Sequence, residues 1–254
     1  MVETGGQILS MKNPLEELQA IIDRATASKD SLKVLEAGCG SLSNITLAAN
    51  VYVVGLDVSA EQLARNRAVH QKIVADLETH TFPDSEYDLI ICWDVLEHLG
   101  QPLAVLRKFF RAIKQDGIIV LAFPNVLSLK GLITKYTPFR FHRLVSGWIY
   151  GDRVGSPGYE VCPTVLRYAI VPTAVARYAA QHGCDVRFIS VFESGMQKRV
   201  RERFGLVKTR WLLLRVLVRL LTFGWVDAEG SDCILVLHPS ASSIPLRPSS
   251  TRAS

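Results

Sequence analysis

The sequence predicts a doubly wound α/β fold, in which helices cover both faces of a mostly parallel sheet. Two observations predict it: short apolar runs of four to seven residues alternate with helical segments, and the first three runs end at a glycine turn or an aspartate. The 254 residues are 48% hydrophobic and 21% charged, which is enough apolar material for a sizeable core without disulfides. This composition excludes a largely disordered or collagen-like chain.

The expected strands are short apolar runs bounded by turn residues or acids. The first ends in the tight turn Gly38-Cys39-Gly40, and the second and third end at Asp57 and Asp76. In chain order they span Leu32 to Ala37, Tyr52 to Leu56, Lys72 to Ala75, Tyr87 to Cys92, Gly117 to Phe123, Val186 to Phe192 and Cys233 to His238.

Helices are expected around these strands because caps precede apolar residues at helical spacing. Asn13 caps the first helix, with Pro14 at its first position, and Ser59 caps the third. In chain order they span Pro14 to about Lys29, Ile45 to Ala49, Ser59 through Val69, Pro102 to Lys114, Pro172 to His182 and Lys198 to Leu221.

Polar residues and glycines gather where the first three strands end. In an open parallel sheet, ligands bind at the carboxyl ends of the strands, where a glycine turn lets backbone amides approach. Gly38 and Gly40 occupy that turn, and Asp57 ends the next strand, where its carboxylate is suited to accept both hydroxyls of a ribose. Asp76 is placed to receive an exocyclic amine. Together they predict a nucleoside-binding edge.

Four stretches carry a resemblance to a known family: VLEAGCGS (34–41), VVGLDVS (53–59), VADLE (74–78) and FPDSEYDLIICWDVLEHL (82–99). With them the chain resembles the class I S-adenosylmethionine-dependent methyltransferases of the methyltransferase type 11-like group. The resemblance covers residues 30 to 125 and, less closely, 165 to 240. It implies a Rossmann-like sheet of seven strands with the last one antiparallel, and S-adenosyl-L-methionine as cofactor.

The resemblance also implies roles for single residues. Glu36, Gly38 and Gly40 are implied to surround the methionine part of the cofactor. Asp57 is implied to bind the ribose diol, and Asp76 with Leu77 to hold the adenine. Trp93 is implied to close the pocket. Where the family has a third glycine, this chain has Ser41, Leu42 and Ser43. A nicotinamide dehydrogenase is the rival interpretation, but its G-x-G-x-x-G would need glycine at position 43.

The implied division of the chain is one methyltransferase domain followed by a tail. Between Asn125 and about Thr164 the alternation of strands and helices breaks, and insertions this long are usually functional. The expected domain spans 1–240, and a disordered tail follows it (241–254). The domain consists of a cofactor-binding half (30–124), a substrate-cap insertion (125–170) and a C-terminal half (171–240). The C-terminal half contains the basic amphipathic helix 198–221.

Methyl transfer from a sulfonium is an in-line displacement, so the protein mainly aligns the reactants and excludes water. A hydroxyl acceptor benefits from a base, and the candidates are His98 and His142, because imidazole titrates near neutrality. His98 alternatively ties a helix start to a loop, and His142 alternatively lies at the rim.

The spacing of Asp94, Glu97 and His98 is similar to an E-x-x-E-H metal site of some quinone-pathway O-methyltransferases. On an α-helix these three side chains share one face, which would suit a divalent cation. The same D-x-x-E-H pattern is also similar to many metal-free relatives. No metal is therefore expected, with these three residues as the alternative.

Charge is unevenly distributed. Residues 125–150 carry a net charge of +4 and residues 197–220 carry +7, which leaves −6 for the rest of a chain of net charge +5. The stripe Arg201, Lys208, Arg215 and Arg219 beside an apolar run is typical of an interfacial membrane helix. The alternative is a helix packed in the core. Nucleic-acid binding is a third option, but no RNA-binding module accompanies the basic residues.

The expected reaction is O-methylation of a small or lipid-like biosynthetic intermediate, since no N-P-P-Y type signature for nitrogen acceptors occurs. A noncatalytic scaffold or partner subunit is the alternative, and an RNA or protein methyltransferase is a lesser one. Five scattered cysteines predict reduced thiols, and no secretory signal is visible. The expected location is the cytoplasm, with peripheral contact at the membrane through 198–221.

Overall fold

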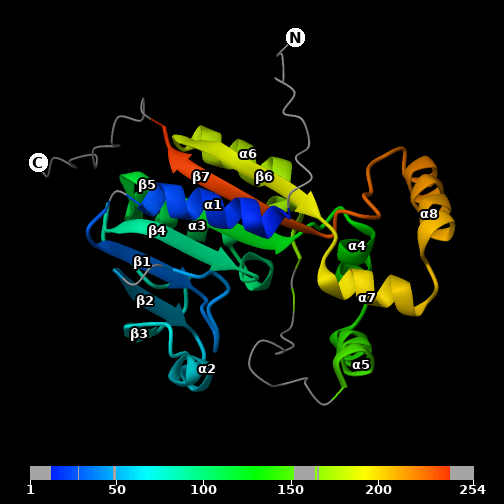
Figure 1. The fold of residues 1–254 in the computed structure, drawn as a ribbon, viewed down its shortest axis with the longest axis horizontal. Helices are drawn as coiled ribbons and strands as arrows, with labels where there is room; N and C mark the ends of the chain where they lie inside the picture. The colour runs from blue at the N-terminus through cyan, green and yellow to red at the C-terminus, as the bar shows by residue number, and fades with distance from the viewer. Residues whose placement is uncertain (1–12, 28, 48–49, 152–163, 165, 241–254) are drawn as a thin grey trace, which may run out of the picture.

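A computed structural model describes residues 13–27, 29–47, 50–151, 164 and 166–240 of the chain. Its sheet has seven strands in the order β3-β2-β1-β4-β5-β7-β6 (Figure 1). The strands are β1 (Leu32–Ala37), β2 (Val51–Asp57), β3 (Gln71–Val74), β4 (Tyr87–Trp93), β5 (Ile113–Pro124), β6 (Cys184–Phe192) and β7 (Asp232–Pro239). β7 runs antiparallel to both of its neighbours, and the other pairs are parallel. The predicted doubly wound fold is confirmed.

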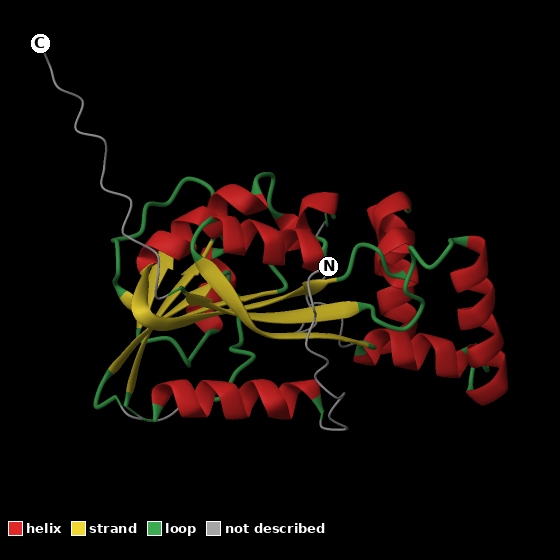
Figure 2. Cartoon of the chain, turned by 90° about the horizontal axis from the view of Figure 1, so that it is seen from above, coloured by secondary structure: helices red, strands yellow, loops and turns green. Residues whose placement is uncertain are grey.

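Helices lie on both sides of this sheet (Figure 2). They are α1 (Pro14–Thr26), α2 (Ala60–Arg65), α3 (Pro102–Ala112), α4 (Leu129–Tyr136), α5 (Phe139–Tyr150), α6 (Pro172–Gln181), α7 (Gly195–Arg203) and α8 (Lys208–Leu221), with short 3₁₀ turns η1 (Leu96–His98) and η3 (Tyr168–Ile170). Apolar residues of α1 and α2 pack on one face of the sheet, and those of α3 and α6 pack on the other. The core therefore consists of two layers separated by the central strands of the sheet, while the outer strands β3 and β6 are partly exposed.

The first helix confirms its predicted cap, since Asn13 Oδ1 accepts from the amide of Leu15 at 3.2 Å. The structure corrects the helix expected at Ile45 to Ala49. Residues 45–47 are irregular, and 48–49 lie outside the described residues. Asn44, the β-branched Ile45 and Thr46 are weak helix formers, which accounts for the difference.

The helix expected from Ser59 through Val69 ends early, at Arg65. Asn66 terminates it: its Oδ1 accepts from the amide of Ala68 at 3.0 Å, and its Nδ2 donates to the carbonyl of Cys39 at 3.2 Å. A side chain that bonds to its own downstream backbone competes with helix continuation. The same residue thus ends α2 and holds the glycine turn after β1.

The single helix expected over Lys198 to Leu221 is two helices in the structure, α7 and α8. Gly205 has φ +64°, and the amide of Leu206 bonds the carbonyl of Arg201 at 2.8 Å. The amide of Gly205 also bonds the carbonyl of Glu202 at 3.0 Å, which completes a glycine-based C-cap. The predicted basic stripe was wrong in one respect: Arg201 belongs to α7, and the other three basic residues belong to α8.

The helices α4, α5, α7 and α8 gather beyond the ends of the strands, at one end of the molecule (Figures 1 and 2). We call this group of four helices the cap. Polar contacts connect it to the sheet: Lys130 Nζ donates to Asp232 Oδ1 at 2.9 Å and to Ser194 Oγ at 3.1 Å. Gln197 Nε2 also donates to the carbonyl of Ala228 at 3.0 Å. The cap is therefore joined to the ends of β5, β6 and β7.

The cysteines that the structure describes are free and buried, namely Cys39, Cys92, Cys184 and Cys233. Burial raises the pKa of the Cys39 thiol to about 12, so this thiol stays protonated at neutral pH. Cys162 and the tail 241–254 lie outside the described residues. Among the residues that are described, no helix is long and apolar enough to cross a bilayer.

Candidate active site

The turn after β1 requires glycine at its first position. Gly38 has φ +72°, and a methyl group there would lie 2.4 Å from Cγ2 of Val95. Val95 follows β4, so the turn and the β4 loop are in close contact. Gly40, also at positive φ (+49°), donates its amide to Asp57. The predicted pair of glycines is thus brought to the carboxyl edge of the sheet.

Asp57 connects two segments at this edge. Its Oδ2 accepts from the amide of Gly40 and its Oδ1 accepts from the amide of Ser59, each at 2.8 Å. The residue is 9% exposed. Each carboxylate oxygen has a further lone pair, so both can still accept a hydroxyl. These remaining acceptor positions fit the two hydroxyls of a ribose, and the ribose contact itself stays a prediction.

Ser43 occupies the position where a dehydrogenase would need glycine. Its hydroxyl donates to Oε2 of the buried Glu36 at 2.5 Å. Burial raises the pKa of Glu36, and the hydrogen bond from Ser43 opposes the shift. The serine therefore fixes the loop against Glu36, a role that a third glycine could not perform.

The other predicted cofactor residues lie at the ends of β3 and β4. Asp76 is exposed, and its Oδ1 accepts from the amide of Glu78 at 2.8 Å, which turns the chain after β3. Leu77 is buried in the core next to it. Trp93, at the end of β4, is half-buried against the apolar layer under α1. An apolar side chain beside an exposed carboxylate is suited to a flat base with an exocyclic amine.

The residues Asp94, Glu97 and His98 do not share an α-helical face, which corrects the basis of the alternative metal site. Asp94 has φ +52° and precedes the 3₁₀ turn Leu96–His98. Nε2 of His98 is 3.9 Å from Oε1 of Glu97. Within the described residues, no group of three or more His, Cys, Asp or Glu side chains is placed to hold a metal ion.

Glu97 is a buried acid of this loop. Burial raises its pKa well above the ordinary value, and the nearby charge of Asp94 adds to the shift. No donor among the described residues bonds its Oε2. The buried site therefore favours the neutral, protonated form of Glu97, the residue next to His98 in the chain.

A polar cluster at the same edge was not predicted from the sequence. The side chain of Asp94 is exposed on one side, yet desolvation by the protein packed around it raises the pKa of its carboxyl to about 6. The charge of Asp232 adds to the shift and that of Lys130 opposes it. Lys130 and Asp232 are 102 positions apart in the chain. No local sequence pattern links these two residues, so their pairing could not be predicted. The one relevant signal in the sequence was that Asp232 comes where the last strand begins.

His142 lies in the cap, on α5. Its Nε2 is 2.7 Å from the hydroxyl of Thr137, and its ring contacts Phe141. Burial lowers the pKa of His142, so the ring is neutral at pH 7. Within the described part of the chain, no hydrogen bond joins it to the strand-end residues.

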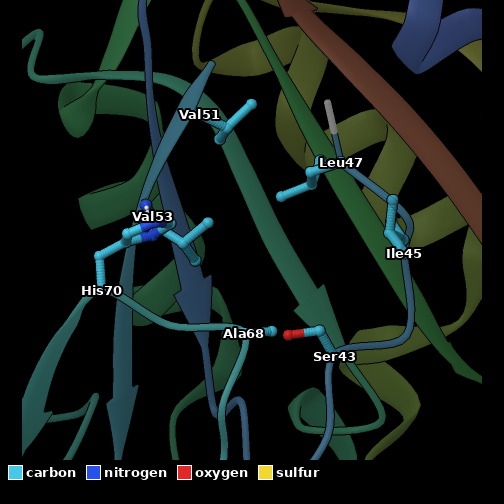
Figure 3. A pocket seen from close by; sticks show the side chains of 7 residues that line it. All are labelled: Ser43, Ile45, Leu47, Val51, Val53, Ala68 and His70. Atoms are coloured by element: carbon cyan, nitrogen blue, oxygen red, sulfur yellow. Dashed lines mark hydrogen bonds between the residues drawn. The ribbon is translucent and has the colours of Figure 1, made fainter. Parts of the chain in front are cut away.

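A cavity of about 270 Å³ lies beside the site, between the β1–β2 connection and β2 (Figure 3). Figure 3 shows Val51 and Val53 on one side and Ile45 and Leu47 on the other. None of the predicted cofactor residues lines it; the lining residues are Ser43, Ile45, Leu47, Val51, Val53, Ala68 and His70.

The fold and this edge define a cofactor-binding α/β domain, and comparison with known proteins identifies its family. The sequence profile of the "Methyltransferase domain" family matches residues 11–154. The chain is 27% identical over 175 residues, 66% of this chain and 65% of the relative, to a probable S-adenosylmethionine-dependent methyltransferase of Mycolicibacterium smegmatis. It is 30% identical over 131 residues, 46% of this chain and 55% of the relative, to a ubiquinone biosynthesis O-methyltransferase of Glaesserella parasuis.

A solved structure has the same fold. The crystal structure of a putative methyltransferase from Bacillus halodurans superposes with a TM-score of 0.52 at 15% identity, covering 88% of this chain and 97% of that one. The chain spans between half and two thirds of the length of the first curated relatives it matches.

The chain belongs to the class I S-adenosylmethionine-dependent methyltransferase family. The cofactor of this family is S-adenosyl-L-methionine.

Proposed function

We propose that this protein transfers a methyl group from S-adenosyl-L-methionine to a hydroxyl of a small or lipid-like biosynthetic intermediate. The observation that carries the proposal is the Asp57 carboxylate, which bonds the amides of both the β1 turn and the β2 end and retains lone pairs for a ribose diol. When bound, the cofactor supplies an electrophilic methyl group on a sulfonium.

The remaining cofactor contacts follow from the strand ends. Asp76 and Leu77 hold the adenine from the end of β3, and Trp93 closes the pocket after β4. Glu36 is buried at the end of β1, and it binds the methionine part together with the glycine turn of Gly38 and Gly40. The chain's contribution is to align and enclose the sulfonium, because its leaving group departs neutral.

A base assists if the acceptor is a hydroxyl. His98 is the stronger candidate because it belongs to the loop after β4, beside the strand ends. His142 is the weaker candidate, because its Nε2 already bonds Thr137 inside the cap. Each histidine is tested by changing it to Gln and measuring kcat as a function of pH.

The similarity to a ubiquinone biosynthesis O-methyltransferase supports an oxygen acceptor of partly apolar character. The aromatic and apolar side chains of α4 and α5 are suited to such a molecule. We place the reaction in the cytoplasm, where reduced cysteines are stable. A noncatalytic scaffold and an RNA or protein methyltransferase remain as outcomes of the experiment.

The experiment is incubation of the full chain with methyl-labelled S-adenosyl-L-methionine and fractionated cell extract. Lipid, small-molecule, protein and RNA pools are then counted separately. The proposal predicts label in the lipid or small-molecule pool, which disappears with Asp57→Ala and persists with the surface control Asp84→Ala. Label confined to RNA or protein would overturn the acceptor class, and no label in any pool, with intact cofactor binding, would favour the scaffold.

A further inference from the structure

The helix α8 (Lys208–Leu221) lies at the outer end of the cap (Figures 1 and 2). Only one of its side chains, that of Trp211, is buried. This contradicts the alternative of a helix packed in the core. Packing within the described part of the chain therefore does not explain why so many side chains of α8 are apolar.

Two contacts fix which face of α8 points inward. Trp211 is 8% exposed, and the guanidinium of Arg201 lies 5.4 Å from the centre of its ring. One turn later, Arg215 pairs with Glu229 at 2.5 Å. Both anchors lie on the same side of the helix, so the opposite side is presented to solvent.

The outward side is almost entirely aliphatic. Its members are each between 47% and 71% exposed, and they are Leu212, Leu213, Val216, Leu217, Leu220 and Leu221. At 100° per residue they form one continuous arc. A contiguous exposed apolar face of this kind usually marks an interaction site.

The turn after α8 adds two exposed aromatic side chains at the end of the helix. Phe223 has φ +51°, a conformation that bulky residues rarely adopt, and it is 91% exposed. Trp225, two residues on, is 77% exposed. Here an aromatic side chain occupies the left-handed position that glycine usually takes in a helix C-cap. Residues held in such unfavourable backbone conformations are concentrated at functional sites.

Exposed cations accompany the aliphatic arc. Lys208 and Arg219 lie along one edge, and Arg210 lies within the arc near its other edge, at the first turn of the helix. No acid occurs from residue 203 through residue 226. A second copy of this face would bring like charges together, whereas an anionic lipid surface complements it.

We propose that the outward face of α8, with Phe223 and Trp225, binds the surface of a bilayer that contains anionic phospholipid. The helix has 14 residues. At about 1.5 Å per residue it is about 21 Å long, less than the roughly 30 Å of a hydrocarbon core. It therefore lies parallel to the surface, with its aliphatic arc in the acyl region and its cations among the headgroups.

This binding does not depend on the proposed methyl transfer. The cap places α8 at the same end of the molecule as the carboxyl edge of the sheet (Figure 1). If the proposed function holds, an apolar acceptor reaches the site from the membrane without crossing bulk water.

The test is co-sedimentation of the full chain with vesicles of phosphatidylcholine alone or with about one third phosphatidylglycerol. The wild type is expected to bind the anionic vesicles, less so at high salt, and to bind the neutral ones weakly. Leu220→Glu places a charge in the aliphatic arc and abolishes binding. The matched control is Leu15→Glu, the same change at an exposed position of α1, where binding is retained.

The electrostatic contribution has its own variants. The triple change Lys208→Gln, Arg210→Gln and Arg219→Gln lowers the partition coefficient about 100-fold, at about fivefold for each cation near the surface. Its control, Arg24→Gln with Arg107→Gln and Arg111→Gln, removes three exposed cations from α1 and α3 and changes binding by less than about threefold.

Several outcomes would overturn the proposal. They are a folded wild type that binds no vesicles at low salt, a Leu220→Glu variant that binds as well as wild type, and a wild type that dimerises through α8 in light scattering and binds no lipid. Each variant is also titrated with S-adenosyl-L-homocysteine, which should bind normally throughout. Loss of lipid binding with intact titration separates this inference from the proposed function.

Discussion

The carboxyl edge of the sheet and the cap beyond it present opposite surfaces. At the edge, buried or turn-forming carboxylates such as Asp57 accept backbone amides from other segments. In the cap, cations border exposed aliphatic side chains, and α8 is held by Trp211 and one ion pair. The segments 125–150 and 197–220 carry the chain's positive charge, while the remainder is at −6.

This difference teaches that one chain can separate rigid recognition from surface attachment. The edge needs fixed geometry because a nucleoside is recognised by a few directed hydrogen bonds. A lipid surface is fluid and needs only amphipathicity with the correct sign of charge. We therefore expect substitutions at the edge to be costly and most substitutions in the cap to be tolerated.

The largest effect is expected for Gly38→Ala. The new methyl group would meet Val95 at 2.4 Å at a positive φ, which should cost about 2 to 4 kcal/mol of stability. In the cap, Gly147→Ala meets no atom within 4 Å and should add about 0.5 to 1 kcal/mol, because alanine favours a helix interior. Urea unfolding measures both. Equal effects of the two changes would remove the proposed contrast in rigidity.

The next effect concerns Asp57. Asp57→Ala leaves the amide of Gly40 without its acceptor and removes the proposed ribose contact, so S-adenosyl-L-homocysteine should bind about 100-fold more weakly. Asp84→Ala removes an equally charged but exposed carboxylate and should bind as wild type does. Calorimetric titration at one salt concentration gives the comparison. Unchanged binding to Asp57→Ala would show that the nucleoside lies elsewhere.

A smaller effect is expected from Glu97→Gln, and it depends on pH. A carboxyl group whose pKa is raised in the folded state keeps its proton after the unfolded chain has lost it, so stability falls as pH rises above the ordinary value of 4.5. The variant lacks this titration and should be more stable than wild type at pH 7, by about 1 to 2 kcal/mol, and no more stable at pH 4. Thermal melts from pH 4 to pH 8 measure the difference. A constant difference across this range would contradict the shift.

The smallest effect is expected from Arg215→Gln in α8. The Arg215–Glu229 pair is about two fifths exposed on both sides, and such pairs contribute about 0.5 kcal/mol or less. Unfolding should be nearly unchanged and insensitive to salt. A loss above about 2 kcal/mol would mean that the ion pair, rather than Trp211, fixes the orientation of α8.

The strands were predictable because each has a local signal, whereas the roles of the residues expected to bind the cofactor stay predictions. Apolar runs ending at Gly38, Asp57 and Asp76 define both the sheet and its edge. The orientation of α8 was not predictable, because the partners of Trp211 and Arg215, which are Arg201 and Glu229, lie outside the helix, beyond the turns at its two ends. The break at Gly205 was signalled by a glycine after a basic turn, a pattern that the sequence interpretation passed over.

Two further differences have local physical reasons. The connection 45–47 resembles a helix in its apolar spacing, yet its β-branched residues and brevity leave it irregular. The hydrogen bonds of Lys130 to Ser194 and Asp232 join three separate segments, so no pattern within one segment predicts them. The division into parts and the roles of His98 and His142 stay predictions.

The most direct measurement of the central claim is equilibrium titration of the full chain with S-adenosyl-L-homocysteine and, separately, with NAD. The arrangement of Asp57, the glycine turn and Ser43 predicts saturable binding of the first and none of the second. Tight binding of NAD with no binding of S-adenosyl-L-homocysteine would contradict the account.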